Sequence, residues 1–225
     1  MLIGNWMTKD PISVAPDTTM MRAAKTIKDK AVHMLPVVDA GNKVVGVVTD
    51  RDLKEASPSK ATTLDVHELY YLLSEIKVKD IMTSKVYSLT PEDTVERAAV
   101  LMRDKRIGGL PIVDADSRLV GVITESDVMD VLIKITGVLH GGFQIGFALS
   151  NQPGSLLALI EDLAAKGCRI MSVLTAYESK AENQRHVFIR VMDMDKSAQK
   201  KLLEELGAKH TVLFSVRDDV PAVRP

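Results

Sequence analysis

The sequence LPVVDAGNKVVGVVTDRD at residues 35–52 has a counterpart in the same chain, LPIVDADSRLVGVITESD at residues 110–127. The same separation of 75 residues relates Met7-Thr8 to Met82-Thr83 further upstream. Without a gap, about twenty of the 47 positions paired in this register are identical, far more than two unrelated stretches of average composition would share. The chain therefore contains a duplication, with one copy expected at 1–56 and the other at 78–137.

Each copy has the residue pattern of a strand, a helix, two strands and a second helix. Short apolar runs at 12–15 and 86–89 are strand candidates, and each stops before a proline. In the next segment of both copies, apolar residues recur at i, i+3, i+4 and i+7, which predicts one buried helical face. Asp93 and Glu96 have the spacing of a capping box at the start of the second of these helices. Two β-branched runs joined by turn residues at 39–42 then predict a hairpin before the final helix.

Between the copies, residues 57–77 begin as a polar linker and continue with leucines and an isoleucine at helical spacing. We expect an extra helix there. Its apolar face packs either against the paired copies or against a second subunit, and the second possibility would make the protein a homodimer.

After residue 141 the pattern changes to that of a separate domain, expected at 142–219. Its segments follow the order β-α-β-β-α-β, which is the ferredoxin-like arrangement. The expected elements lie at about 143–149, 156–164, 170–177, 186–192, 197–206 and 211–216. Residues 220–225, which include two prolines, are predicted to form a frayed tail.

Composition and charge narrow the class of protein. Hydrophobic residues make up 46% and charged residues 26%, which is ordinary globular usage. The formal net charge of -1 provides no positive field for a nucleic acid or a lipid surface, so neither is expected as a partner. The one cysteine, Cys168, suits a buried thiol in a reducing compartment, and no apolar run reaches the roughly 18 residues of a membrane-spanning helix. We therefore expect a cytoplasmic protein.

The repeated Leu-Pro-Val-Val-Asp and Gly-x-x-Thr-x-x-Asp motifs, with the Met-Thr that leads into each copy, resemble the CBS domain family. Its members occur as tandem pairs, called Bateman modules, that pack into one disc-like unit. The resemblance implies an α/β (α+β) fold in which two β-α-β-β-α repeats form one module ahead of the ferredoxin-like domain. In family members that bind adenosine compounds, these motifs contact ribose and phosphate. The implied regulatory ligand is therefore AMP, ADP, ATP or S-adenosylmethionine.

The Thr-x-x-Asp motif also has a chemical reason to lie where a strand ends and a helix begins. A helix N-terminus presents unpaired amides and a partial positive charge, so Thr49 and Thr124 can help to hold a phosphate there. Asp52 and Asp127 lie one turn further along and can accept hydrogen bonds from both hydroxyls of a ribose. The same spacing is equally that of an ordinary helix cap, and this alternative stays open.

Neighbouring positions complete the candidate nucleotide site. Gly46 and Gly121 allow a ligand or a neighbouring strand to approach the backbone, and Val47 and Val122 offer an apolar wall for a purine. The other candidates are basic residues and positions that flank the motifs: His33, Met34, Pro36, Arg51, Arg106, Gly109 and Pro111. Each basic residue could instead be a solvated surface charge.

The two copies differ at some of these positions. His33-Met34 corresponds to Gly108-Gly109, and Arg51 corresponds to Ser126. We therefore expect the two pockets to bind one ligand unequally.

In the C-terminal domain, Asn-x-Pro-Gly-x-Leu follows the first expected strand. This motif in a β-α-β-β-α-β order resembles the ACT domain, a small regulatory fold that pairs through its sheets or helices and often binds amino acids where subunits meet. The resemblance implies a site for a small carboxylate at Asn151, Gly154, Ser155 and Leu156, although a cap and a tight turn would explain the same residues. A CBS pair followed by an ACT domain is similar to the AcuB family of acetoin-utilisation proteins, which implies a small cytoplasmic regulator.

No catalytic constellation is recognisable. None of the five histidines forms a pair at i, i+4, and the glycine motifs of nucleotide-cleaving and dinucleotide-binding enzymes are absent. We therefore expect no enzyme, no catalytic cofactor and no metal site. The expected function is regulation: the CBS pair senses metabolite or energy state, and the signal passes through dimer and ACT-domain packing. The alternatives are a constitutive dimerisation scaffold with vestigial pockets and an amino-acid-responsive regulator.

Overall fold

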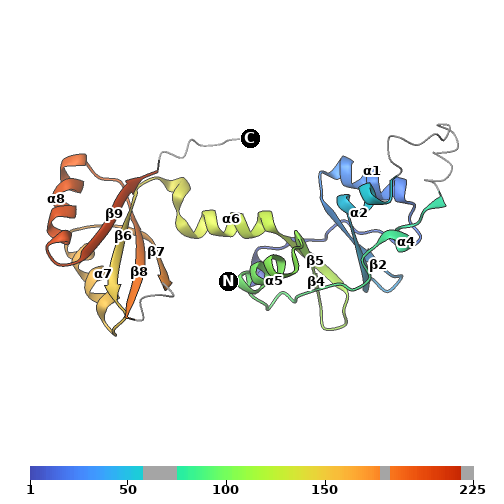
Figure 1. The fold of residues 1–225 in the computed structure, drawn as a ribbon, viewed down its shortest axis with the longest axis horizontal. Helices are drawn as coiled ribbons and strands as arrows, with labels where there is room; N and C mark the ends of the chain where they lie inside the picture. The colour runs from blue at the N-terminus through green and yellow to red at the C-terminus, as the bar shows by residue number, and fades with distance from the viewer. Residues whose placement is uncertain (58–74, 178–182, 219–225) are drawn as a thin grey trace. The chain divides into compact units, whose positions relative to one another are not determined.

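The computed structural model describes residues 1–57, 75–177 and 183–218. The chain divides into two compact units, Met1–Val128 and Met129–Pro225 (Figure 1).

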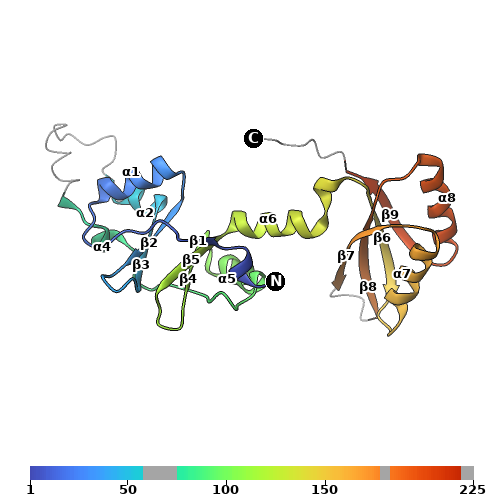
Figure 2. The same cartoon turned by 180° about the vertical axis from the view of Figure 1, so that it is seen from behind.

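In the first unit, both copies contain a helix, an antiparallel hairpin and a second helix, as expected (Figure 2). The first copy consists of α1 (Met20–Lys30), β2 (Met34–Val38), β3 (Val44–Thr49) and α2 (Asp50–Glu55). The second copy consists of α5 (Val95–Lys105), β4 (Gly109–Val113), β5 (Leu119–Thr124) and α6 (Glu125–Thr136). Helix α6 begins in the first unit and continues past Val128 into the second. Each element of the second copy begins 75 residues after its counterpart, so the duplication in the sequence is also a duplication of structure.

The short first strands predicted at 12–15 and 86–89 are reduced to one bridging residue each. Val14 pairs in parallel with Val37 of β2, and Leu89 pairs in the same way with β4. The Val14 N–H donates to the carbonyl of Pro36. Because Pro36 has no N–H, it cannot donate a hydrogen bond to the residues before Val14, which would have extended the parallel ladder. A proline at this position of each hairpin therefore ends the ladder after a single pair.

The predicted capping box of Asp93 and Glu96 is wrong. The N-cap of α5 is Thr94, whose hydroxyl oxygen accepts a hydrogen bond from the Arg97 N–H at 3.2 Å. Asp93 instead accepts from the N–H of Thr90 at 2.9 Å. Since the helix begins one residue later than the spacing indicated, Glu96 falls too early in the first turn to reach back to the cap, and it pairs with the N-terminal ammonium at 2.9 Å.

The segment that leads into each copy packs against the other copy. The short strand β1 (Thr8–Lys9) belongs to the first copy, but it pairs antiparallel with β5 of the second, with Thr8 opposite Val122. Thr83, the counterpart of Thr8, bridges in the same way to Val47 of the first copy.

Two short helical turns extend this exchange. They are the 3-10 turn η1 (Ile3–Asn5) and α4 (Val78–Ile81), which again begin 75 residues apart. The N–H groups of Ile3 and Val78 donate to the segment just before the first helix of the opposite copy, at 2.9 and 2.8 Å. Both side chains are fully buried, and Val78 lies in the core of the first copy. Each copy therefore completes its core with a residue supplied by the other.

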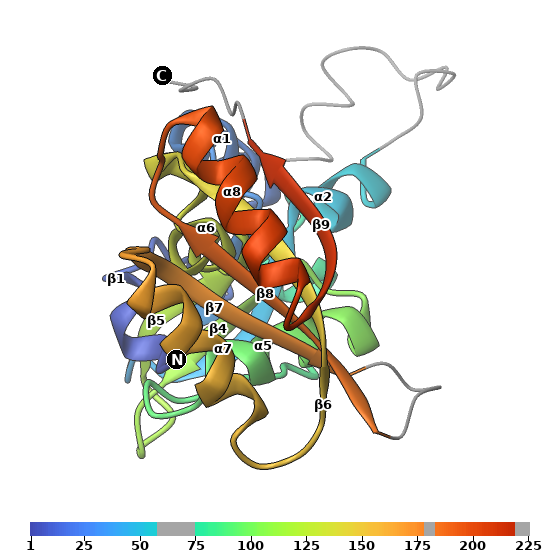
Figure 3. The same ribbon diagram turned by 90° about the vertical axis from the view of Figure 1, so that its left-hand side faces the viewer.

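The second unit is a four-stranded antiparallel sheet with α7 and α8 on one face (Figure 3). Its elements are η2 (Val138–His140), β6 (Phe143–Ser150), α7 (Ser155–Ala165), β7 (Ile170–Tyr177), β8 (Gln184–Val191), α8 (Lys196–Gly207) and β9 (Thr211–Arg217). The strands lie in the order β7-β8-β6-β9. This order confirms the predicted ferredoxin-like arrangement.

Alternation along the central strand explains how this sheet holds its helices. Phe143, Ile145 and Phe147 of β6 are fully buried and share one core with Leu159 and Leu163 of α7. The side chains between them point to the opposite face of the sheet, which α7 and α8 do not cover.

Two sequence predictions fall on residues that the structure does not describe. Most of the linker and helix expected at 57–77 and the whole tail expected at 220–225 lie outside the described residues. Within the described ranges, none of the helices is long and apolar enough to cross a membrane.

Candidate functional site

The hairpin of the first copy gathers four of the predicted nucleotide-site residues on one face. In the β2–β3 register, Met34 lies opposite Thr49 and Pro36 lies opposite Val47. Residues that face each other across an antiparallel pair project from the same side of the sheet, and alternate residues project from the other side. That other side carries residues such as Leu35, which is fully buried in the core of the copy.

The hairpin of the second copy repeats this geometry. Gly109 lies opposite Thr124 and Pro111 lies opposite Val122 in the β4–β5 register. Val122 is more buried than its counterpart Val47, with 8% of its surface exposed. The structure therefore brings these predicted positions together on one hairpin face in each copy, although the packing around them differs.

Thr49 and Asp52 form a closed set of hydrogen bonds at the start of α2. Asp52 Oδ2 accepts from the Thr49 N–H at 2.7 Å and from the Thr49 hydroxyl at 2.8 Å. In return, Thr49 Oγ1 accepts from the Asp52 N–H at 3.3 Å. Thr124 and Asp127 make the same three bonds at 2.7, 2.8 and 3.3 Å at the start of α6. The capping alternative that the sequence left open is thus realised in both copies.

The caps leave one carboxylate oxygen available in each copy. All of the bonds above use Oδ2, and among the described residues neither Asp52 Oδ1 nor Asp127 Oδ1 accepts a hydrogen bond. A carboxylate oxygen has two acceptor positions, which is enough for a hydroxyl pair on one sugar. Capping and ligand binding are therefore compatible roles for the same side chain.

The basic candidates lie at the edge of these faces and are exposed. Arg51 is in the first turn of α2, and the carbonyl of His33 accepts from the Asp50 N–H at 3.2 Å. A hydrogen bond from Lys54 to Asp50 at 3.2 Å, with a smaller attraction from His33, holds the pKa of the Asp50 carboxyl below its usual range. In the second copy, Arg106 ends α5 in a left-handed conformation with φ of 56°.

The two glycines of the repeated motif make room for a methionine of the opposite copy. A Cβ added at Gly46 would lie 2.3 Å from Met82 Sδ, and one added at Gly121 would lie 2.5 Å from Met7 Sδ. Of the two reasons that the sequence offered for these glycines, the close approach of a neighbouring segment is the one observed. The Met-Thr lead-in and the glycine are thus parts of one contact.

One difference between the copies has a packing reason. A Cβ added at Gly109 would lie 3.1 Å from the terminal methyl of Met34, the residue at the corresponding position of the first copy. The long side chain of one copy therefore occupies the space left by the glycine of the other.

Sequence reasoning missed two residues beside these faces. Thr83 exchanges backbone hydrogen bonds of 2.9 and 3.0 Å with Val47, which places it along the edge of β3. Thr8 takes the equivalent place opposite Val122. The repeated Met-Thr was the available signal, but only the tertiary structure shows that each threonine reaches the other copy.

The carboxylate site predicted in the second unit lies at the start of α7. Gly154 is the N-cap, with φ of 86°, and no side chain caps the helix. Asn151 precedes it and is exposed, while Leu156 lies in the first turn. The Ser155 hydroxyl donates to a backbone carbonyl at 2.7 Å and accepts from the Arg185 guanidinium at 3.2 Å. Arg185, on β8, is a neighbour that no local sequence signal indicated.

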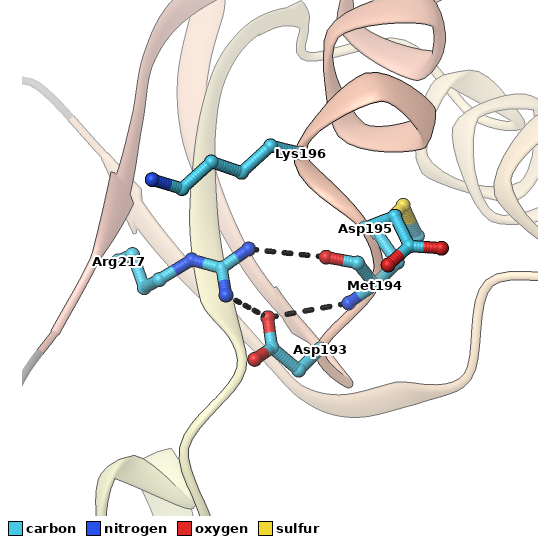
Figure 4. A pocket seen from close by; sticks show the side chains of 5 residues that line it. All are labelled: Asp193, Met194, Asp195, Lys196 and Arg217. Atoms are coloured by element: carbon cyan, nitrogen blue, oxygen red, sulfur yellow. Dashed lines mark hydrogen bonds and ion pairs between the residues drawn. The ribbon is translucent and has the colours of Figure 1, made fainter.

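Two pockets lie away from these residues. One, of about 420 Å³, is on the second copy beside α5. The other, of about 510 Å³, lies beside α8 and is lined by Asp193, Met194, Asp195, Lys196 and Arg217 (Figure 4). There the Arg217 guanidinium donates to the Met194 carbonyl at 3.2 Å and pairs with Asp193. Neither pocket is lined by a predicted nucleotide-site residue.

Comparison with known proteins identifies the repeated unit. The family model for the CBS domain matches residues 3–59 and 78–134, about half of the chain. A CBS domain-containing protein of Dictyostelium discoideum is 36% identical over 134 residues, which are 60% of this chain and 92% of that protein.

Solved structures agree with this match. A structure from Vibrio cholerae that carries the name acetoin utilization protein (AcuB) is 27% identical, with a TM-score of 0.52 over 62% of this chain and 96% of that one. CBSX2, a CBS-pair protein of Arabidopsis thaliana, is 32% identical in its complex with AMP, with a TM-score of 0.50 over 60% of this chain and 97% of that one. With two matched copies that exchange their lead-in segments, this chain belongs to the CBS domain family.

Proposed function

We propose that this chain is a non-catalytic regulatory protein whose CBS pair binds an adenine nucleotide or an adenosyl compound. The observation that carries the proposal is the duplicated hairpin face with an adjacent carboxylate oxygen that accepts no hydrogen bond among the described residues. The AMP complex of CBSX2, a relative by structure, supports this class of ligand.

In this proposal each residue has a distinct role. The purine lies against the apolar hairpin face at Pro36 and Val47, and Asp52 Oδ1 accepts from the ribose hydroxyls. The Thr49 hydroxyl proton is directed to Asp52, so the helix amides and the side chains of His33 and Arg51 hold the phosphate. The second copy offers the equivalent hairpin face at Pro111 and Val122 and the equivalent carboxylate oxygen at Asp127.

The two sites differ in charge, and we propose that they differ in ligand. The first copy has His33 and Arg51 at its edge, whereas the second has Gly108 and Ser126 at those positions and only Arg106 nearby. A phosphate-bearing nucleotide is favoured where more cationic groups converge. We therefore assign AMP, ADP or ATP to the first site and a less anionic adenosyl compound, such as S-adenosylmethionine, to the second.

We further propose that α6 passes the signal on within a cytoplasmic homodimer. Asp127 lies in its first turn, and Thr136 at its other end accepts a hydrogen bond from the Ser172 hydroxyl of β7 at 3.0 Å. A ligand that binds one arrangement more tightly shifts the population by no more than that difference in affinity.

The test is a melting screen on the full chain with AMP, ADP, ATP and S-adenosylmethionine. At 100 times its dissociation constant, a ligand should add about 2.7 kcal/mol to the free energy of unfolding. Asp52→Ala should remove the shift given by AMP, and Asp127→Ala should spare it. Asp80→Ala is the matched control, because Asp80 caps α4 through the Lys77 N–H at 2.9 Å but lies outside both sites.

Each contrary outcome points to a different error. Equal shifts in the wild type and in both site variants would mean that the residues are assigned wrongly. The absence of any shift would favour a constitutive dimerisation scaffold. Turnover of a ligand, abolished by one substitution, would instead make the protein an enzyme.

A second candidate function rests on the start of α7. We propose that the C-terminal unit is an ACT domain and that Asn151, Gly154, Ser155 and Leu156 surround a small carboxylate, such as that of an amino acid. The uncapped first turn and the nearby Arg185 guanidinium supply donors of the right charge. A panel of amino acids in the same melting screen, repeated on Arg185→Gln, tests this role: a shift that the variant retains in full would contradict it.

A further inference from the structure

The pocket on the second copy lies between residues 87–89 and one side of α5. Its volume of about 420 Å³ is within the range of small-molecule sites. The lining residues are Tyr87, Ser88, Leu89, Arg97, Val100, Leu101, Asp104 and Lys105. None of them belongs to the nucleotide site or to the site at the start of α7, so this pocket is a separate candidate site.

The pocket side of α5 is not the side that forms the core. Val95, Ala98 and Met102 are the buried residues of this helix. Val100, on the pocket side, is 49% exposed, whereas Leu89 across from it is almost completely buried and forms a fixed floor. The apolar surface that α5 presents to the pocket therefore remains open to a ligand.

Comparison with the first copy separates the lining residues that both repeats share from those that are particular to the second. The positions of Ser88, Arg97, Asp104 and Lys105 carry the same four residue types 75 positions earlier. Three lining positions differ in polarity or aromatic character: Tyr87, Val100 and Leu101 correspond to Ile12, Lys25 and Thr26. Because α1 and α5 have the same length and the same type of N-cap, the aromatic and apolar wall is not needed to form the helix.

The charges around the pocket leave one cation to meet a ligand. Asp104 pairs with Arg103 at 2.9 Å, and Arg97 pairs with an aspartate one turn earlier at 2.5 Å. Lys105 forms no ion pair within the described residues, and its Nζ lies 5.2 Å from the centre of the Tyr87 ring. A single ammonium beside an aromatic ring suits a singly charged anion with a flat body.

We propose that this pocket binds a small monocarboxylate with a flat apolar body. Its carboxylate pairs with Lys105, and its body lies between the Tyr87 ring and the Val100 and Leu101 side chains. Such a ligand would give the protein a second small-molecule input besides the nucleotide.

The experiment is an NMR titration of the full chain with indole-3-acetate and with its uncharged analogue indole-3-acetamide. Both should shift the methyl resonances of Val100 and Leu101, and the acid should bind up to about fivefold more tightly, the effect of one exposed ion pair. Lys105→Gln should abolish this preference. Lys30→Gln, the matched change in the first copy, should leave it intact.

A second variant tests the apolar wall without risk to the fold. Tyr87→Ile combined with Leu101→Thr introduces residues that the first copy tolerates, and it should weaken both probes about tenfold. The proposal is overturned if neither probe shifts these methyl groups or if acid and amide bind Lys105→Gln as they bind the wild type. It is also overturned if sedimentation shows that the double variant dissociates a dimer while its affinity for the probe is unchanged, because the pocket would then be a contact between copies.

Discussion

Gly46 and Gly121 lie where a methionine sulfur leaves no room for a side chain. Each lies under the Met side chain that leads into the opposite copy, closer than any Cβ allows. The motif that the sequence presents as part of a ligand site is therefore first a packing device between the copies.

Gly46→Ala should destabilise the first unit by about 1–3 kcal/mol, because the new methyl group overlaps Met82 Sδ. The measurement is urea unfolding. In a Met82→Ala background the same substitution should cost much less, and an equal cost in both backgrounds would contradict the contact. Gly207→Ala is the control: among the described residues no atom outside the helix's own backbone lies within 4 Å of an added Cβ, so it should change stability by at most about 1 kcal/mol.

Asp93 offers a pH test at the same scale. The Thr90 N–H, followed by the charge of Arg97, holds the pKa of the Asp93 carboxyl below its usual range. A lowered pKa adds stability that is complete above the unfolded value of about 3.9 and is lost as the pH falls through the folded value. The difference in unfolding free energy between wild type and Asp93→Asn should thus be constant above about pH 5 and should shrink below about pH 4. A difference that persists unchanged to pH 2 would contradict this account.

At the scale of elements, a threonine begins the first helix of each copy. Thr19 and Thr94 accept from the N–H three residues on, at 3.3 and 3.2 Å. The acid that the sequence suggested as a cap lies one position too early. Helix boundaries depend on which of several adjacent polar residues the tertiary contacts place at the cap, and periodicity does not resolve this.

Thr94→Ala should therefore cost about 1 kcal/mol of stability, and Thr19→Ala should cost a similar amount. Glu96→Gln should cost less, since its partner is an exposed ammonium at 2.9 Å. Thermal unfolding of the three variants decides between the caps. A larger loss for Glu96→Gln than for Thr94→Ala would restore the capping box.

At the scale of the whole molecule, the exchanged segments make the two copies depend on each other. In the sequence, Ile3 belongs to the first copy and Val78 belongs to the second, but each is a buried residue that packs into the opposite copy. Neither copy has a complete core by itself. The pair is therefore one folding unit, although the sequence presents it as two repeats.

Ile3→Ala should cost about 2–5 kcal/mol, and Val78→Ala should also destabilise the unit. Hydrogen exchange shows where the loss falls: Ile3→Ala should lower protection first in α5 and β5, and Val78→Ala should lower it first in α1 and β3. If each variant instead weakened the copy to which it belongs in sequence, the exchange of segments would be wrong.

The sequence by itself determined the repeat, the order of elements and the C-terminal topology, because periodicity and turn residues act over a few neighbours. It also placed Thr49 and Asp52 together, since three residues across a strand-to-helix junction are always close. Only the tertiary structure decided what lies beyond that range: Met82 against Gly46, Met34 against Gly109 and Arg185 beside Ser155. These partners are distant in sequence, and their approach is set by how exchanged segments and neighbouring strands pack, which no local pattern encodes.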